Sequence, residues 1–109
     1  MDDVTGGQIP PMTFEIVGGD SAAPVVKIAG ELDISTIDEL ATAVAPIVAR
    51  RVDSLTLDLS ELRFADSSAI ALWVRWAASV RDLRLINVSP LLRRVVETMG
   101  LTETLGLET

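Results

Sequence analysis

The chain has 109 residues, of which 49% are hydrophobic and 23% charged, and a formal net charge of −7 at pH 7. That length gives one domain with a core of its own, and the acidic balance argues against binding to a nucleic-acid backbone. The absence of cysteine and histidine excludes disulfides and thiolate chemistry, and it removes the commonest general base and transition-metal ligand.

The hydropathy of the chain does not predict a membrane span. No run of apolar residues reaches the roughly 18 that a membrane-spanning helix needs. Residues 1–12 are acidic, contain paired glycines and prolines, and lack the apolar centre of a signal peptide. We therefore expect a flexible N-terminal tail over 1–12, one domain over 13–109, and a cytoplasmic protein.

The predicted domain begins with a β-hairpin. Residues 13–17 (TFEIV) and 25–29 (VVKIA) are rich in β-forming side chains, and the residues between them are of turn type. A helix is expected next. Thr36 and Glu39 have the spacing of a capping box, and Ser35 with Asp38 offers a second register. Pro46 predicts a bend or an end of this helix, although the apolar stripe beyond it favours continuation.

The second half of the chain again alternates strands and helices. Residues 54–59 (SLTLDL) alternate as a strand does, and SELRFADSS is interpreted as a loop. A helix is predicted over 68–80 and a strand over 83–87 (LRLIN). The last residues, 101–109, are expected to add a short edge strand or a turn.

The third predicted helix has clear signals at both ends. Ser89 is an N-cap, Pro90 takes the first helical position, where proline is tolerated, and Gly100 is the expected stop. The residues expected to face inward are Leu92, Val95, Val96 and Met99.

The order β-β-α-β-α-β-α predicts the α/β class, with a mixed four- to five-stranded sheet flanked by about three main helices. The first hairpin is antiparallel and the remaining strands are parallel. Loops that follow parallel strands open at one edge of the sheet, where α/β folds place their sites. We therefore expect this edge to carry GELD (30–33), ELRFADSS (61–68) and NVSP (87–90), and we expect Asp33 to be a neighbour of Asp66, Ser67 and Ser68.

The triplet Asp66-Ser67-Ser68 has two interpretations. Aspartate and serine are favoured N-caps, so the triplet needs no further role. A hydroxyl at a helix N-terminus is also a good place for a phosphate, because free N–H groups and the helix dipole receive its charge. The residues alone favour neither serine as the acceptor.

The helix after the triplet is predicted to keep one narrow face in solvent. Ser68, Arg75 and Ser79 fall close together on a helical wheel, with Ala71 and Leu72 beside them. This face is either a docking stripe or the thin wet side of a mostly buried helix.

Enzyme activity is not expected. No histidine base, G-x-S-x-G turn or Gly-Lys-Ser/Thr loop is present, and Lys27, the sole lysine, lies in a strand. Asp58 lies near a strand end, as in aspartate phospho-acceptors, but the lysine that such chemistry needs on a late strand is missing. We expect no metal and no organic cofactor.

Three segments resemble the STAS domain family, which takes its name from sulfate transporters and anti-sigma factor antagonists. They are KIAGELDISTIDEL (27–40), LTLDLSELRFADSSAIALW (55–73) and VSPLLRRVVETMGL (88–101), in the family order. The resemblance implies a stand-alone anti-sigma factor antagonist. In that class, an anti-sigma factor that is also a serine kinase binds the unphosphorylated antagonist and thereby releases a sigma factor. Phosphorylation ends the complex, and a phosphatase resets it.

The resemblance also implies roles for single residues. The first serine after the aspartate is the acceptor, which is Ser67 here, with Ser68 as the alternative. Asp33 and Asp66 are its neighbours, and the residues expected to contact the partner are Glu31, Ala69, Leu72 and Arg75. The family usually has glycine where this chain has Ala69. Alanine hinders the site if the backbone there needs a positive φ, and stabilises it if the position is helical.

Two other functions remain open. Related domains are constitutive scaffold subunits of membrane transport assemblies for lipids or anions, a role that requires no phosphorylation. A ligand-sensing domain would bind a small molecule at the same sheet edge.

Overall fold

The computed structural model describes residues 10–107, and its order of elements is the predicted β-β-α-β-α-β-α. Of the predicted tail, residues 1–9 lie outside the described residues, whereas Met12 is the buried first residue of a strand. The elements are β1 (Met12–Val17), β2 (Val25–Leu32), α1 (Ile37–Ala49), β3 (Leu55–Ala65), α2 (Ser67–Ser79), β4 (Leu83–Ile86) and α3 (Pro90–Thr98).

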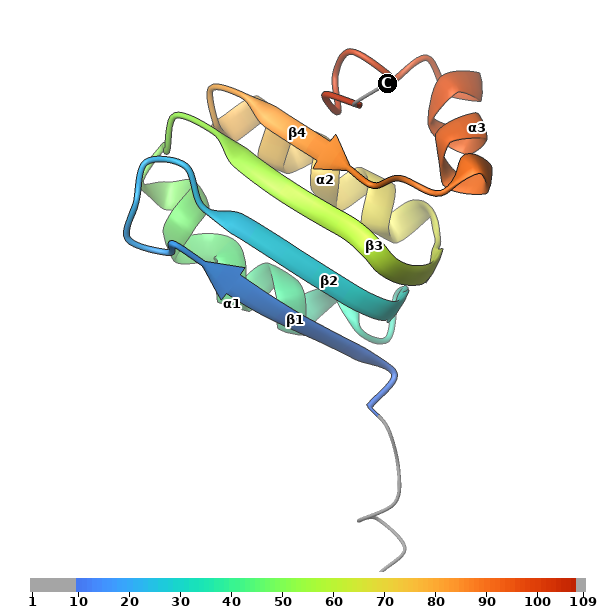
Figure 1. The fold of residues 1–109 in the computed structure, drawn as a ribbon, viewed down its shortest axis with the longest axis horizontal. Helices are drawn as coiled ribbons and strands as arrows, with labels where there is room; N and C mark the ends of the chain where they lie inside the picture. The colour runs from blue at the N-terminus through green and yellow to red at the C-terminus, as the bar shows by residue number, and fades with distance from the viewer. Residues whose placement is uncertain (1–9, 108–109) are drawn as a thin grey trace, which may run out of the picture.

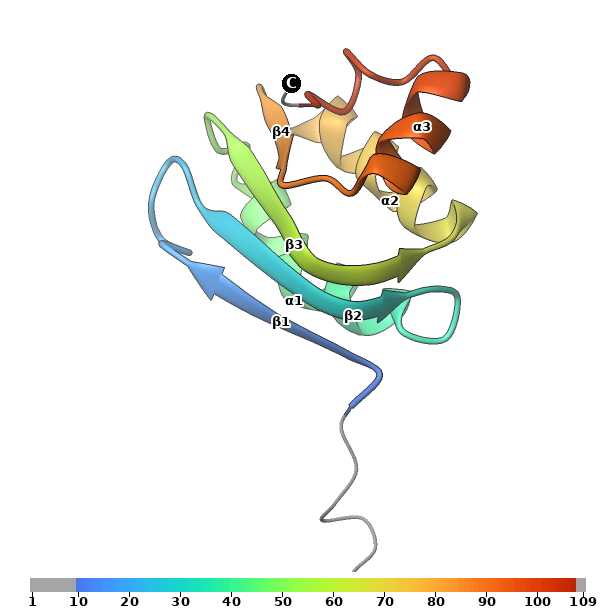
Figure 2. The same ribbon diagram turned by 45° about the vertical axis from the view of Figure 1, so that its right-hand side comes forward.

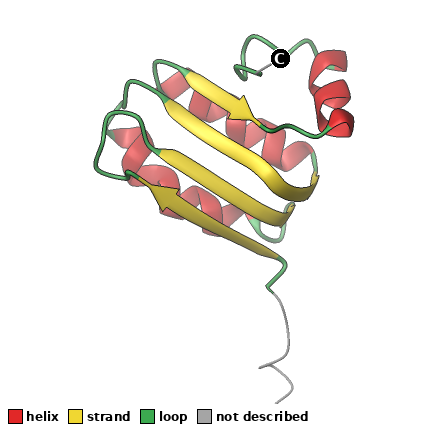
Figure 3. Cartoon of the chain, in the orientation of Figure 1, coloured by secondary structure: helices red, strands yellow, loops and turns green. Residues whose placement is uncertain are grey.

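The four strands form one sheet in the order β1-β2-β3-β4. β1 pairs with β2 in antiparallel fashion, and the β2–β3 and β3–β4 pairs are parallel, which confirms the predicted mixed sheet. Helices α1 and α2 cover one face, the opposite face of β1–β3 is left uncovered, and α3 lies beyond β4 (Figures 1 and 3). Near the C-terminus, Leu107 adds an isolated parallel bridge to Leu85.

The core lies between the sheet and the two helices behind it. Alternate strand residues point toward these helices because successive side chains of a strand face opposite sides. Trp73 of α2 is fully buried against this layer. The largest fully buried aliphatic side chains come from every strand but β1, from α1 and α3, and from the C-terminal turn: Val26, Ile28, Leu32, Leu40, Val44, Leu55, Leu57, Leu85, Val96 and Leu105.

Strand β3 is longer than predicted, and this changes the edge of the sheet. The expected loop after residue 59 is instead strand as far as Ala65, because β2 also continues and pairs Gly30 with Leu62. β4 stops opposite Asp58. The segment 87–90 therefore leaves the sheet beside the middle of β3, but its Ser89 still lies near the end of β3, where it lines a pocket together with Leu62 and Ala65.

Two of the three helices, α2 and α3, begin directly after a residue whose side chain makes a capping hydrogen bond. In α3, the Ser89 hydroxyl accepts the Leu92 N–H at 3.2 Å, and Gly100 has φ +73°, as the sequence predicted. Helix α2 begins one residue earlier than predicted, at Ser67. Helix α1 continues through Pro46. Its predicted capping box was wrong, because the side chain of the N-cap residue Thr36 makes no capping hydrogen bond.

The inward face of α3 is narrower than predicted. Leu92 and Val96 are buried, but Val95 and Met99 are 39% and 52% exposed. Figure 2 shows α3 at the margin of the sheet rather than over its face, and this placement leaves Val95 and Met99 at the surface.

Candidate functional site

Two loops meet at the edge of the sheet where β2 and β3 end (Figure 2). Leu32 pairs with Ala65, and the Asp66 N–H donates to the Leu32 carbonyl at 3.2 Å, which ties the loops together. The negative charge of Asp66 raises the pKa of Asp33 and so opposes the hydrogen bonds from Ser35 that lower it, which places the two carboxylates within electrostatic reach. The structure therefore brings these aspartates together, as the sequence predicted.

Asp66 caps helix α2. Its backbone is extended, and its Oδ1 accepts the Ser68 N–H at 2.9 Å, the Ser68 hydroxyl at 2.5 Å and the Ala69 N–H at 3.4 Å. The hydrogen bond from the Ser68 hydroxyl is the main reason that the pKa of Asp66 lies below its usual value, and partial burial opposes it. The capping interpretation of the triplet is confirmed for Asp66, and the Ser68 hydroxyl donates to the capping carboxylate.

Ser67 differs from Ser68 in both exposure and hydrogen bonding. It is the exposed first residue of α2, and within residues 10–107 its hydroxyl has no hydrogen-bond partner. The Ser68 hydroxyl is half-buried and held by Asp66. Ser67 is thus the hydroxyl of the triplet that an incoming group reaches without breaking the cap.

The neighbouring loop before α1 uses its hydroxyls internally. Asp33 accepts the Ser35 hydroxyl at 2.6 Å and the Ser35 N–H at 2.9 Å, and these bonds lower the pKa of Asp33. The buried Thr36 hydroxyl donates to the Glu31 carbonyl at 3.0 Å and accepts the Asp33 N–H at 3.0 Å. Asp33 is therefore an oriented carboxylate beside the triplet.

The predicted docking stripe on α2 is only partly exposed. Arg75, Ser79 and Ala71 lie at the surface. Leu72 is 3% exposed and Ala69 is fully buried, so their expected role as surface contacts was wrong. Helix α2 packs against the sheet and also against α1, and this second contact widens the buried arc beyond the one expected from the helical wheel.

Ala69 stands in a helical position, directly inside α2. Among residues 10–107, the non-glycine residues with positive φ are Arg51 and Asn87, so alanine at position 69 carries no such strain. The other residue predicted to contact a partner, Glu31, is exposed near the end of β2.

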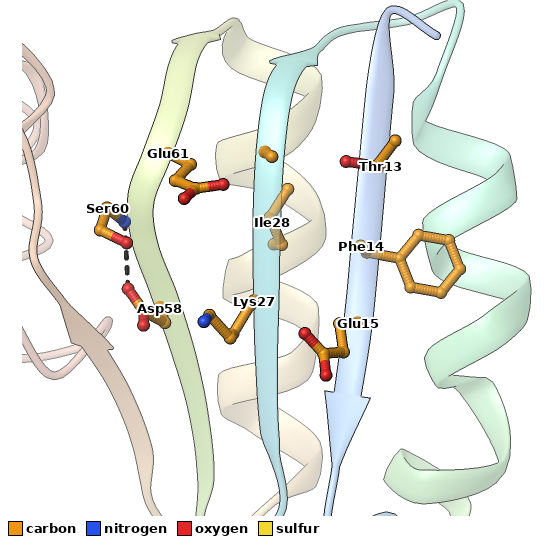
Figure 4. A pocket seen from close by; sticks show the side chains of 9 residues that line it. Thr13, Phe14, Glu15, Lys27, Ile28, Asp58, Ser60 and Glu61 are labelled. Carbon is orange, nitrogen blue, oxygen red and sulfur yellow. Dashed lines mark hydrogen bonds between the residues drawn. The ribbon is translucent and has the colours of Figure 1, made fainter. Parts of the chain in front are cut away.

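The uncovered face of the sheet carries a shallow hollow of about 140 Å³, shown in Figure 4, with Glu15, Lys27 and Asp58 on its walls. Asn87 donates to Asp58 at 3.0 Å and lowers its pKa, and the Ser60 N–H binds the same oxygen at 3.1 Å. Within the described part of the chain, no three acidic side chains are grouped so as to hold a metal ion. No helix of residues 10–107 has the length and hydropathy to cross a membrane.

The family relationship follows from a comparison with protein families. Residues 17–108 match the model of the family described as "Mlab, STAS domain". The chain therefore belongs to the STAS domain family. Among curated proteins, none matches the chain closely enough to count as a relative.

Solved structures that share this fold include anti-sigma factor antagonists. The chain is similar to one from Mycobacterium paratuberculosis, with a TM-score of 0.78 and 25% identity over 88% of this chain and 84% of that one. It shares its fold with the Bacillus cell fate determinant SpoIIAA in the phosphorylated form (TM-score 0.66, 22% identity, 89% and 92% covered). It also shares its fold with SpoIIAA in its unphosphorylated form, with a TM-score of 0.70 and 24% identity over 89% of each chain.

Proposed function

We propose that this STAS domain is an anti-sigma factor antagonist whose binding is switched by phosphorylation of Ser67. The class is supported by the likeness to the mycobacterial antagonist over 88% of the chain. One observation carries the switch: the Ser67 hydroxyl is exposed and has no hydrogen-bond partner among residues 10–107, whereas Ser68 is held by Asp66. The unphosphorylated protein binds an anti-sigma factor with serine kinase activity and so frees a sigma factor in the cytoplasm.

The position of Ser67 lets the fold tolerate the modification. Transfer of the γ-phosphoryl group of ATP to Ser67 Oγ forms an ester, releases ADP and the hydroxyl proton, and adds about −1.5 to −2 charges. Repulsion from Asp33 and Asp66 opposes this charge. The N-terminus of α2 offsets the repulsion by about 0.3–1 kcal/mol, so the fold survives.

The same charge acts strongly on the complex. A partner surface shaped for a neutral hydroxyl meets a dianion, and unfavourable charges at an interface cost several kcal/mol. That cost lowers the affinity by about two orders of magnitude or more. Glu31, near the end of β2, and Arg75, within α2, are both exposed and are proposed to contact the partner. A phosphoserine phosphatase restores the binding form.

The test uses candidate kinase anti-sigma factors from the same organism. Each is incubated with ATP and with wild type, Ser67→Ala, Ser68→Ala or the control Ser79→Ala, which changes another exposed serine of α2. Mass spectrometry reads the phosphate, and calorimetry reads the affinity. We expect Ser67→Ala to bind but to take up no phosphate, and Ser67→Asp to bind about 100-fold more weakly.

Two results contradict the proposal in different ways. Full phosphorylation of Ser67→Ala at Ser68 overturns the site. Stable binding with no phosphorylation of either serine favours the alternative function, a constitutive scaffold subunit of a lipid or anion transport assembly.

A further inference from the structure

An apolar groove lies between the end of β3 and helix α3, and we call it the β3–α3 groove. It has a volume of about 240 Å³, and its walls include Leu62, Arg63 and Phe64 from β3 and Leu91 and Val95 from α3. Among residues 10–107, six large hydrophobic side chains are exposed, and Phe64, Leu91 and Val95 are three of them. Three of these six exposed side chains therefore line one groove, the arrangement expected of a binding surface.

One wall of the groove is an open strand edge. β4 pairs with β3 only as far as Asp58, and β3 continues to Ala65. The chain turns away from the sheet at Asn87, whose φ is +58°, and enters α3. In the described part of the chain, no strand pairs with 62–65 on the α3 side. Backbone groups at such an edge accept an added extended segment.

The groove is flanked by positive charge in an acidic chain. Arg63 of β3 lines the groove. Arg94 follows Leu91 by three residues in α3, so Arg94 and Leu91 are neighbours on the surface of that helix. Both arginines are exposed, and within residues 10–107 neither forms an ion pair. An occupant with carboxylates would supply the missing partners.

We propose that the β3–α3 groove binds an extended segment of the anti-sigma factor that carries apolar side chains and carboxylates. The inference rests on the proposed function, because Phe64 and Ala65 lead directly into Asp66 and Ser67. A segment held in the groove brings the kinase over the Ser67 hydroxyl. A second copy of this chain fits less well, because two chains of charge −7 repel one another.

The test measures the affinity of an anti-sigma factor that binds the unphosphorylated wild-type chain. The first variant is Leu91→Ala/Val95→Ala, and its control is Val17→Ala, which truncates a side chain of 48% exposure at the opposite end of the sheet. We expect the groove variant to bind at least about tenfold more weakly and the control to stay within about twofold.

Charge reversal gives a second measurement. Arg63→Glu/Arg94→Glu is expected to bind at least about tenfold more weakly, and the loss should shrink as salt is raised. The control is Arg81→Glu, at a side chain that is 80% exposed. Thermal unfolding of each variant confirms that it is folded.

The outcomes separate this inference from the proposed function. If Ser67→Asp weakens binding and both groove variants bind as wild type does, the groove inference alone is overturned. If wild type binds no anti-sigma factor, the proposed function fails and this inference fails with it. If sedimentation shows that wild type is a dimer and that the groove variants are monomers, the occupant is a second copy, and the inference is overturned.

Discussion

The loop before α1 and the loop before α2 lie side by side and are built from the same residue types. Each has an aspartate two residues before a serine, Asp33 before Ser35 and Asp66 before Ser68. In each, the aspartate accepts both the hydroxyl and the backbone N–H of that serine. The two loops nevertheless differ in what they leave available at the surface.

The difference lies in the remaining hydroxyl group of each loop. Before α1, the second hydroxyl belongs to Thr36, which is 7% exposed and bonded to the Glu31 carbonyl and the Asp33 N–H. At the start of α2, it belongs to Ser67, which is exposed and has no partner within residues 10–107. A loop whose hydroxyls are all bonded is structural, and a loop that leaves one free suits modification.

The largest expected effect concerns the packing of α2, the helix that carries Ser67 and Ser68 at its start. Leu72 is 3% exposed, so Leu72→Ala leaves a cavity and should lower the free energy of unfolding by about 2–5 kcal/mol. Arg75→Ala, at an exposed position of the same helix, should change it by less than about 0.5 kcal/mol. Urea denaturation measures both. Equal stability of the two variants would contradict the buried position of Leu72.

The next effect concerns the loop before α1. Thr36→Val keeps the shape of the side chain but leaves the Asp33 N–H and the Glu31 carbonyl without their partner. We expect a loss of about 1–3 kcal/mol in the free energy of unfolding. The control is Thr42→Val, at an exposed position within α1, which should cost less than about 0.5 kcal/mol. A Thr36→Val variant as stable as the control would mean that the Thr36 hydroxyl has no structural role.

A smaller effect concerns the cap of α2 and its dependence on pH. Asp66→Ala should cost about 0.5–2 kcal/mol, whereas Asp66→Asn should keep most of the cap, because asparagine is an equally good N-cap. The Ser68 hydroxyl lowers the pKa of Asp66 in the folded state. The stability gained is therefore present above the usual pKa of aspartate and lost as pH falls through the lowered value.

The direction of this pH dependence can be measured directly. Between about pH 5 and about pH 2, wild type should lose more free energy of unfolding than Asp66→Asn, whose side chain does not titrate. Parallel curves for the two proteins would show that Asp66 has no lowered pKa.

Local signals in the sequence predicted most of the helices and strands, but they did not predict the second half of β3. Ser89 with Pro90 and Gly100 define α3 because caps act within a few residues. The second half of β3 escaped prediction because two register shifts between β2 and β3 break its alternation. Its strand character comes from pairing with β2, for example Gly30 with Leu62, and not from its own residues.

The candidate site shows the same division. The sequence predicted that Asp33 and Asp66 would meet, because parallel strands end at a common edge. It could not separate Ser67 from Ser68, since both are serines and only the direction of each side chain decides which one binds Asp66. Nor could it show that Leu72 is buried, because the contact between α1 and α2 joins distant parts of the chain.

The smallest expected effect is the sharpest test of the difference between the two serines. Ser68→Ala removes the 2.5 Å hydrogen bond to Asp66 and should lower the free energy of unfolding by about 0.5–1.5 kcal/mol. Ser67→Ala removes a hydroxyl that has no partner in residues 10–107, so it should change stability by less than about 0.5 kcal/mol. Denaturant midpoints of the two variants, compared at neutral pH, give the answer. A Ser67→Ala variant that loses more stability than Ser68→Ala would mean that Ser67, and not Ser68, completes the cap, and the free hydroxyl would then belong to Ser68.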